Sequence, residues 1–493
     1  MIRLSDTALQ ALPPGVAAPA GRPSAVSIVH LGLGAFHRAH QVEYTEDALR
    51  LAGTPRGRWG ICGVSLKTPG ARDRLAAQDG LYTLVRKSPR GSERRVLGAL
   101  REVRFLGDER HDVHERLAAP DTAIVSLTIT EKGYGHDPAT GALDAAHPEI
   151  APDLADPGHP RSAVGLVVGS LDARRLSHGR PYTVLCCDNL PHNGALLRGL
   201  VLDFARRRDA ALAGWIDHNV TFPSTMVDRI VPATTPADGE ENDRALGMHD
   251  AAPVVCEPFR QWVIEDAFVA GRPPWELAGA ELVADVAPFE TMKLRLLNGS
   301  HSALAYLGFL AGHEFVYQVA AQPAFVAYMR ALMAEAAPTL RVPSSVDLAG
   351  YRDALVERFA NPALPHRTWQ IAMDGSQKLP QRLLGTVREN LAAGRPIVRL
   401  TLAVAAWMRY ATGVDERGAA IDVRDPLGEQ FRAIAQRLRG DPDALCDAFL
   451  GLRAVFGDDL PAQPRFAGGV REWLAALYRE GAARTVATCN QRA

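Results

Sequence analysis

The feature that most constrains the fold of this chain is a short apolar run that ends in a glycine turn. Residues 27–31 (SIVHL) have the pattern of a buried strand, GLGAFH follows at 32–37, and a helical pattern continues over 38–49. Dinucleotide-binding folds use such a turn to bring backbone N–H groups and a helix dipole to a pyrophosphate. His37 replaces the third glycine of that motif, so the turn alone also fits an ordinary tight turn. On the first interpretation, the cofactor-binding residues are Gly32, Gly34, Ala35 and Phe36.

A second strand pattern, residues 59–66 (WGICGVSL), follows at the distance expected for a dinucleotide-binding unit. In such units the strand usually ends in Asp or Glu, which binds the ribose 2′-hydroxyl of NAD. Ser65 occupies that region here, and the nearby Lys67 and Arg72 are either attractive to a 2′-phosphate or ordinary solvated residues. We expect Ser65 to contact the cofactor, which we expect to be NAD, with NADP left open.

Three more buried-strand patterns lie farther along the chain, at 122–130, 181–187 and 225–231. Short runs rich in β-branched residues predict a mainly parallel sheet. After residue 285 the patterns become helical, at 289–310, 322–335, 346–359, 400–412 and 427–438. The predicted fold class is therefore α/β, with a Rossmann-type N-terminal domain over residues 1–284 and a mostly α-helical C-terminal domain over 285–493.

Composition and charge exclude several classes of protein. The 493 residues include 55 basic and 56 acidic side chains, a balance that argues against a nucleic-acid partner. No apolar stretch approaches the roughly 18 residues that a membrane-spanning helix requires. The six cysteines form no CxxC pair and the histidines no HExxH motif, so we expect no disulfide framework and no metal. Without a signal-peptide pattern, we expect a cytoplasmic protein, as a monomer or homodimer.

Polar residues stand in or after two of the predicted strands. Asn189 follows the run 181–187, and Asp228 and Arg229 interrupt the run 225–231. Ligands of open α/β sheets bind beyond the carboxyl ends of the strands, so we expect Asn189 to meet the substrate or the nicotinamide. The alternative for Asn189 is a turn or helix cap. Asp228 and Arg229 form either a structural ion pair or part of the substrate site.

The strongest chemical signal is the segment ETMKLRLLNGSH at 290–301. At about 100° per residue, four of its polar side chains share one broad face of an α-helix with two leucines: Glu290, Lys293, Asn298 and His301. Burial on this face would disfavour the charged form of Lys293, which is the condition for a lysine to act as general base. Asn298 and Asn189 are suited to stabilise an oxygen that becomes anionic. The alternative is that the lysine snorkels and the polar residues bridge helices.

A second polar string lies between helical patterns, with HRTWQ at 366–370 and DGSQKLPQR at 374–382. Its turn residues and cations suit either a solvated loop or a surface that binds a polyhydroxylated or carboxylated substrate. The candidate substrate-binding residues in this string are Arg367, Lys378 and Arg382.

Taken together, these segments resemble the polyol-specific long-chain dehydrogenase/reductase family, which includes mannitol 2-dehydrogenase and fructuronate reductase. The resemblance runs in family order over nearly the whole chain, and its KxxxxNxxH element is far more specific than the glycine turn. It is carried by HLGLGAFHRAHQ (30–41), VSLTITEKGY (125–134), CCDNLPHNG (186–194), FPSTMVDRIVP (222–232), CEPFRQWVIEDAF (256–268), MKLRLLNGSHSALAYLG (292–308), FANPALPHRTWQIAMDGSQKLPQR (359–382) and AAWMRYATGVDERGAAIDVRDPL (405–427).

The resemblance implies a metal-independent, NAD(P)-dependent enzyme that interconverts a secondary alcohol and a ketone at C2 of an open-chain sugar derivative. It further implies that Lys293 is the general base and that Asn189 and Asn298 stabilise the alkoxide. It also implies a proton relay through Glu290 and contacts to the substrate or nicotinamide from His301, Asp228 and Lys378.

Two departures from the family pattern matter: Gln370, which leaves the substrate open, and the missing acidic residue after the second strand, which weakens the case for strict NAD use. Some mannitol dehydrogenases carry an arginine where this chain has Gln370, and the run 366–382 is closer to the fructuronate reductase branch, in which Arg367 or Arg382 would meet a carboxylate. CDNLPHNG, by contrast, is closer to the polyol branch. We expect a polyol dehydrogenase of the mannitol-to-fructose or arabinitol-to-xylulose type. The alternatives are a fructuronate reductase, which acts on a sugar acid, and a catalytically silent dinucleotide-binding regulator.

Overall fold

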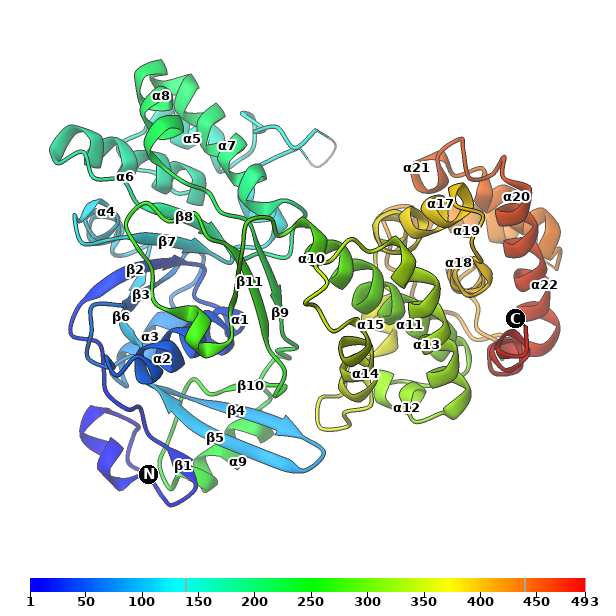
Figure 1. Cartoon of the computed structure of the whole chain (residues 1–493), viewed down its shortest axis with the longest axis horizontal. Coiled ribbons are helices and arrows are strands. Elements are labelled where there is room, and N and C mark those ends of the chain that lie inside the picture. Colours follow the sequence, from blue (N-terminus) through cyan, green and yellow to red (C-terminus); the bar gives the residue numbers. More distant parts are fainter. Residues whose placement is uncertain (138–139, 439, 493) are drawn as a thin grey trace. The chain divides into compact units, whose positions relative to one another are not determined.

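The apolar runs of the first half and the helical patterns of the second half fold into two units, Met1–Ala287 and Pro288–Ala493. Figure 1 shows them in a computed structural model that describes residues 1–137, 140–438 and 440–492. The sequence pattern placed the division after residue 284.

The first unit is built on a parallel five-stranded sheet in the order β6-β3-β2-β7-β8. Every residue of β2, β3, β7 and β8 is buried, because helices cover both faces, as is typical of parallel sheets. This strand order is that of a Rossmann fold, because β2, the first of the five strands in the chain, lies at the centre of the sheet. The predicted α/β class with a parallel sheet is confirmed. The strands are β2 (Val26–Leu31), β3 (Gly60–Ser65), β6 (Leu100–Phe105), β7 (Ile124–Leu127) and β8 (Thr183–Cys186).

Two apolar cores lie on opposite faces of this sheet. Residues of α1, α2 and α3 pack on one face, and residues of α4, α6 and α7 pack on the other. Figure 1 shows α4 to α8 together on the second face. The helices are α1 (Ala35–Ala39), α2 (Gln41–Leu51), α3 (Gly70–Ala76), α4 (Arg110–Ala118), α5 (Ile150–Ala155), α6 (Ala163–Ser177), α7 (Asn193–Arg208) and α8 (Ala210–Asn219).

Two smaller sheets complete the first unit, in the orders β1-β5-β4-β10 and β12-β11-β9. β4 and β5 form an antiparallel hairpin, and β9 pairs antiparallel with β11, so the run that contains Asp228 lies outside the five-stranded sheet. The remaining elements are β1 (Val16–Ala17), β4 (Tyr82–Ser88), β5 (Gly91–Leu97), β9 (Thr225–Asp228), α9 (Pro236–Leu246), β10 (Val254–Cys256), β11 (Gln261–Glu265) and β12 (Glu281–Val283).

The second unit is helical, as expected. Its centre is α18, which is buried throughout residues 400–411 and packs against α11 and α22. The helices are α10 (Ala287–Met292, which begins at the division), α11 (Gly299–Leu310), α12 (Val316–Ala320), α13 (Pro323–Ala336), α14 (Leu348–Phe359), α15 (Thr368–Ala372), α16 (Gly375–Leu379), α17 (Gly385–Ala392), α18 (Val398–Ala411), α19 (Gly428–Arg437), α20 (Pro442–Leu450), α21 (Arg453–Phe456) and α22 (Pro464–Asn490).

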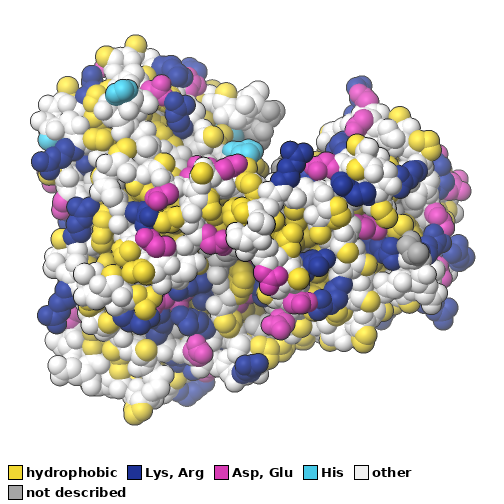
Figure 2. Space-filling model, in the orientation of Figure 1, with side chains coloured by type: hydrophobic (Ala, Val, Ile, Leu, Met, Phe, Trp, Pro, Cys, Tyr) yellow, Lys and Arg dark blue, Asp and Glu magenta, His cyan; other side chains and the backbone are white. Residues whose placement is uncertain are grey.

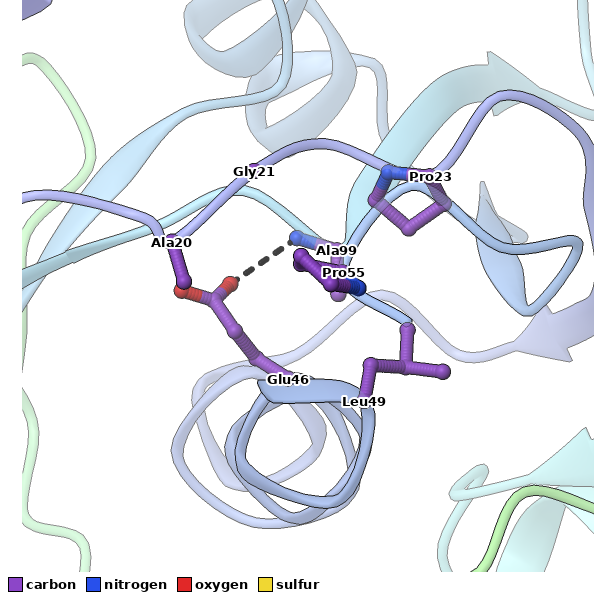
Figure 3. A pocket seen from close by; sticks show the side chains of 7 residues that line it. All are labelled: Ala20, Gly21, Pro23, Glu46, Leu49, Pro55 and Ala99. Atoms are coloured by element: carbon purple, nitrogen blue, oxygen red, sulfur yellow. Dashed lines mark hydrogen bonds between the residues drawn. The ribbon is translucent and has the colours of Figure 1, made fainter. Parts of the chain in front are cut away.

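A small hollow in the first unit lies at the amino ends of the strands, because Pro23 precedes β2 and Ala99 precedes β6 (Figure 3). Its polar residue is Glu46 of α2, which accepts hydrogen bonds from the backbone N–H groups of Gly98 (2.5 Å) and Ala99 (3.1 Å). Burial raises the pKa of Glu46 to about 7. Ligands of such sheets bind at the opposite edge, so the hollow is not the expected substrate site.

On the face drawn in Figure 2, positive and negative side chains are interspersed rather than gathered by sign. Within the described residues, no helix is both long enough and apolar enough to cross a membrane, and no group of three or more His, Cys, Asp or Glu side chains is arranged to hold a metal ion.

Candidate active site

The glycine turn after β2 is shaped by the close approach of β7. Gly32 has a φ of +103°, and a Cβ there would lie 2.0 Å from the carbonyl oxygen of Thr128, so no other residue fits. Gly34 is different: a Cβ there would meet nothing nearer than the Gly32 oxygen at 3.8 Å. The space beside Gly34 is therefore open to a ligand, and α1 begins directly after it. This geometry fits a pyrophosphate at the turn.

A stacked pair of histidines explains the departure from the glycine motif. The rings of His30 and His37 lie 3.4 Å apart and nearly parallel, so His37 fills the space between α1 and the sheet. His30 contacts Ser126 Oγ and Thr128 Oγ1, both at 2.8 Å, and Thr128 Oγ1 donates to the Gly32 oxygen at 3.0 Å. Burial lowers the pKa of His30 to about 3. Two neutral imidazoles therefore support the turn from behind.

Ser65 ends β3 beside this turn. It is buried, and its hydroxyl makes no hydrogen bond within the described residues. The two cations that follow it are both engaged, since Lys67 pairs with Glu149 and Arg72 with Asp73, Asp108 and Glu109.

Asn189 is exposed, and hydrogen bonds of the neighbouring residues fix the loop in which it lies. The Asp188 carboxylate accepts from the backbone N–H groups of Ile129 (2.8 Å) and Thr130 (3.0 Å), which join the ends of β7 and β8. Asn193 Nδ2 donates to the backbone oxygens of Asp188 (2.9 Å) and Thr225 (2.8 Å). These bonds present Asn189 at the carboxyl edge of the sheet, where the substrate was expected.

The neighbours Asp228 and Arg229 have different surroundings. Asp228 is buried as the last residue of β9. The Arg229 guanidinium is fully buried and pairs with Glu43 of α2. Its Nε (3.0 Å) and Nη2 (2.8 Å) donate to the backbone oxygen of Glu257. These contacts give Arg229 a structural role and lend no support to its predicted contact with substrate.

In the second unit, the predicted continuous α-helix over 289–310 is interrupted by a π-helical turn, Lys293–Asn298. The assumed 100° per residue is therefore wrong over this stretch. In a π-turn the hydrogen bonds run from residue i to i+5, so Lys293 and Asn298 are one turn apart and closer in angle than an α-helix would place them. Lys293 is only 8% exposed, and Glu290 and Asn298 are partly buried. Such π-turns are frequent at functional sites.

A second π-helical turn, Pro380–Leu384, packs against the first. Contact is close at Gly299, where a Cβ would lie 3.0 Å from the backbone oxygen of Arg382. Arg382 Nη1 donates to Ser302 Oγ at 3.0 Å, and Lys378 Nζ donates to the backbone oxygens of Ile371 (3.3 Å) and Met373 (2.5 Å).

His301 lies among aromatic rings and basic side chains. Its ring stacks on Phe359 at 4.9 Å and meets the edge of His366 at 5.0 Å. Burial holds the pKa of His301 well below its usual value, and His366, Arg382, Arg358 and Lys378 lower it further. His301 is therefore neutral, and able to donate or accept a hydrogen bond. The sequence did not predict that Arg358 and Phe359 lie near His301, because both are on α14, outside the polar string at 366–382.

Arg367 lies elsewhere. Its side chain is 57% exposed, pairs with Glu314 and stacks over Phe315 at 5.3 Å. Nothing in these contacts supports its predicted binding of a substrate carboxylate.

We predict that Gly32→Ala lowers the free energy of unfolding of the first unit by at least about 2 kcal/mol, since alanine combines a positive φ with the clash against Thr128. Gly34→Ala should leave stability unchanged and weaken dinucleotide binding. Thermal unfolding with and without NADH separates the two. An unchanged melting temperature for Gly32→Ala would contradict the turn geometry.

Comparisons with known proteins agree with this fold. Residues 26–277 match the family model described as the mannitol dehydrogenase Rossmann domain, and residues 285–478 match the mannitol dehydrogenase C-terminal domain. The chain is 49% identical to a D-mannonate oxidoreductase of Escherichia coli over 93% of this chain and 95% of that one. It is 41% identical to a mannitol 2-dehydrogenase of Aspergillus terreus over 94% and 93%.

Two solved structures are similar over their whole length. A Pseudomonas fluorescens mannitol 2-dehydrogenase, solved as a ternary complex with NAD and D-mannitol, is 40% identical with a TM-score of 0.84, and 100% of both chains is covered. A D-sorbitol dehydrogenase in substrate-free form is 34% identical with a TM-score of 0.91, covering 99% of this chain and 100% of that one.

Proposed function

Because this chain belongs to the mannitol dehydrogenase family and is an NAD-dependent oxidoreductase, we propose that it oxidises the C2 secondary alcohol of a linear polyol to a 2-ketose, and catalyses the reverse reduction. The observation that carries the proposal is the buried Lys293 at the start of a π-helical turn that also holds Asn298. This arrangement suits proton abstraction from a hydroxyl next to an oxyanion-stabilising amide.

The fit to a dinucleotide rests on the turn itself: the open space at Gly34, the start of α1 at Ala35 and Phe36, and the hydroxyl of Ser65. Bound NAD supplies the acceptor for the hydride that leaves C2. The chain's own residues hold the sugar and move the proton.

In the proposed mechanism, Lys293 Nζ takes the proton of the C2 hydroxyl as the C–H bond breaks. The side-chain amides of Asn298 and Asn189 donate hydrogen bonds to the oxygen while it carries negative charge. Glu290, one turn before the lysine, passes the proton on from Nζ. His301, in its neutral form, binds a substrate hydroxyl, and Asp228 binds the reacting end of the substrate or the nicotinamide.

A sugar acid is the second candidate substrate, and the basic side chains around His301 favour it. Among the described residues, no carboxylate lies within ion-pair distance of Arg382 or Lys378, although burial lowers the pKa of both. Both side chains are partly buried, and Asp374 and Asp425 act on Lys378 only from a longer distance. A substrate carboxylate would give Arg382 a direct anionic partner. The 49% identity to a D-mannonate oxidoreductase points the same way. The reaction would then be the interconversion of mannonate and fructuronate.

The test is a panel of mannitol, arabinitol and mannonate with NAD and NADP, followed by absorbance of the reduced nicotinamide. A higher kcat/KM for mannitol or arabinitol supports the polyol reaction, and a strong preference for mannonate overturns it in favour of the sugar acid. We propose a cytoplasmic monomer or homodimer. The six free, buried cysteines support that location, and light scattering tests the oligomeric state.

We predict that Arg382→Met lowers kcat/KM for mannonate by about 10²-fold and changes that for mannitol by less than about threefold. Arg382→Lys should recover part of the mannonate activity, because it keeps the charge. The exposed Arg367→Met is the matched control and should affect neither substrate. Equal losses on both substrates would contradict the assignment of Arg382 to a carboxylate.

A further inference from the structure

The end of β3 lacks the acidic residue that usually selects NAD, and two cations follow it. Ser65 is the last residue of the strand, and Lys67 and Arg72 come next along the chain. In sequence alone, these cations favour a 2′-phosphate as much as a 2′-hydroxyl. The contacts of the two side chains decide between these possibilities.

Arg72 is enclosed by three carboxylates. Its Nε donates to Asp73 Oδ1 (2.6 Å), its Nη2 to Asp108 Oδ2 (2.9 Å) and its Nη1 to Glu109 Oε2 (2.5 Å). Each of the three guanidinium nitrogens thereby donates to a carboxylate, and the positive charge of Arg72 is balanced by these partners. Arg104 lies 3.6 Å from Glu109, so the carboxylates of this group still outnumber its guanidinium groups. Lys67 is paired with Glu149.

This group of charges lies at the end of β3, the strand expected to meet the ribose. Ser65 is paired with Phe105 of β6, and the Ser65 backbone oxygen accepts from Leu106 N at 2.9 Å. Phe105 N donates to Glu109 Oε2 at 2.8 Å, and the Arg72 guanidinium lies 5.8 Å from the Phe105 ring. The carboxylates are therefore anchored beside Ser65, through its partner strand.

Ser65 supplies the second, independent observation. Its side chain is 6% exposed, and its hydroxyl makes no hydrogen bond within the described residues. A buried hydroxyl without a partner is unfavourable, and a ribose hydroxyl would satisfy it. A 2′-phosphate at the same place would bring further negative charge beside Asp73, Asp108 and Glu109.

We propose that Ser65 and the carboxylates around Arg72 select a dinucleotide with a free ribose 2′-hydroxyl over its 2′-phosphorylated form, taking the place of the absent strand-end acid. Arg72 attracts no phosphate because Asp73, Asp108 and Glu109 neutralise its charge. The proposal rests on the dinucleotide site of the proposed function, but it concerns cofactor choice and not the polyol. Asp73 and Asp108 are largely exposed, so solvent and salt weaken the repulsion and the expected selectivity is moderate.

Binding measured without substrate tests the proposal. Dissociation constants for NADH and NADPH are obtained by energy transfer from tryptophan to the reduced nicotinamide, at low and high salt. We expect the wild-type protein to bind NADH about tenfold more tightly than NADPH, with a smaller ratio at high salt. The double variant Asp73→Asn/Asp108→Asn should gain at least about fivefold in NADPH affinity and change NADH affinity by less than about twofold. Adding Arg72→Ala should abolish that gain.

Asp458→Asn is the matched control, because Asp458 is an exposed partner of Arg453 in the second unit. Ser65→Ala should weaken NADH binding by about threefold at an unchanged melting temperature. Equal wild-type affinity for the two dinucleotides, or equal shifts of both in the double variant, would overturn the proposal and leave the proposed reaction standing. Selective NADH binding without turnover on any polyol or sugar acid would overturn the reaction and leave the cofactor selection standing.

Discussion

Replacing Lys293 with alanine should lower kcat by about 10³-fold for whichever sugar proves to be the substrate, with the affinity for NADH unchanged. The reason is that Lys293, only 8% exposed, is the group proposed to take the hydroxyl proton, and alanine offers no base in its place. Steady-state rates of nicotinamide reduction measure kcat, and tryptophan energy transfer measures NADH binding.

The Lys293→Arg variant distinguishes a general base from a residue that only supplies a positive charge. Arginine keeps the charge but does not give up its proton, so this variant should be as slow as Lys293→Ala. Small primary amines added to Lys293→Ala should restore part of the rate, and the restored rate should rise with pH as the free amine forms. Turnover near the wild-type level in either variant would contradict the role of Lys293 as the base.

The second large effect is expected on folding. Arg229→Met should lower the free energy of unfolding of the first unit by about 3 kcal/mol, because removing one partner of a buried ion pair leaves the other charge without compensation. The Arg229 and Glu43 side chains are both 0% exposed. Arg260 and Arg86 still contact Glu43, which is why the expected loss is at the lower end of the usual range.

Urea unfolding, monitored by fluorescence of the first unit, measures this loss. Burial alone would raise the pKa of Glu43, but Arg229, Arg260 and Arg86 lower it to about 2. A carboxylate whose pKa is lowered on folding stabilises the fold at pH values above its unfolded pKa. This stabilisation is lost only as the pH falls toward 2, so the effect of Arg229→Met should be constant from pH 6 to 8. If Arg229 instead contacts substrate, the variant would unfold normally and show only a raised KM.

Local patterns predicted the elements of this fold well. The runs 59–66 and 181–187 became β3 and β8, and the helical pattern at 400–412 became α18, because apolar periodicity reflects burial directly. The hairpin of β4 and β5 was not predicted. The first three residues of β5 are exposed and the strand is polar over most of its length, so its sequence carries little of the strand signal.

The site was predicted less completely, for reasons of distance and helix geometry. Glu43 lies 186 residues from Arg229, so no local pattern reveals that pair. The π-helical turn at Lys293 changes the angular relation to Asn298, which an assumed α-helix cannot show. Arg367 and Arg382 are equally basic in sequence, and only the fold exposes the first and partly buries the second.

The central claim is oxidation at the carbon next to a terminal hydroxymethyl group, which is C2 of mannitol. The most direct test is to incubate the protein with NAD and 13C-labelled mannitol, and in parallel with labelled mannonate, and to identify the product carbonyl by NMR. We predict a ketone at that carbon, formed in equal amount with NADH and absent with Lys293→Ala. An aldehyde at the terminal carbon, a ketone elsewhere along the chain, or no NADH from either compound would contradict the account.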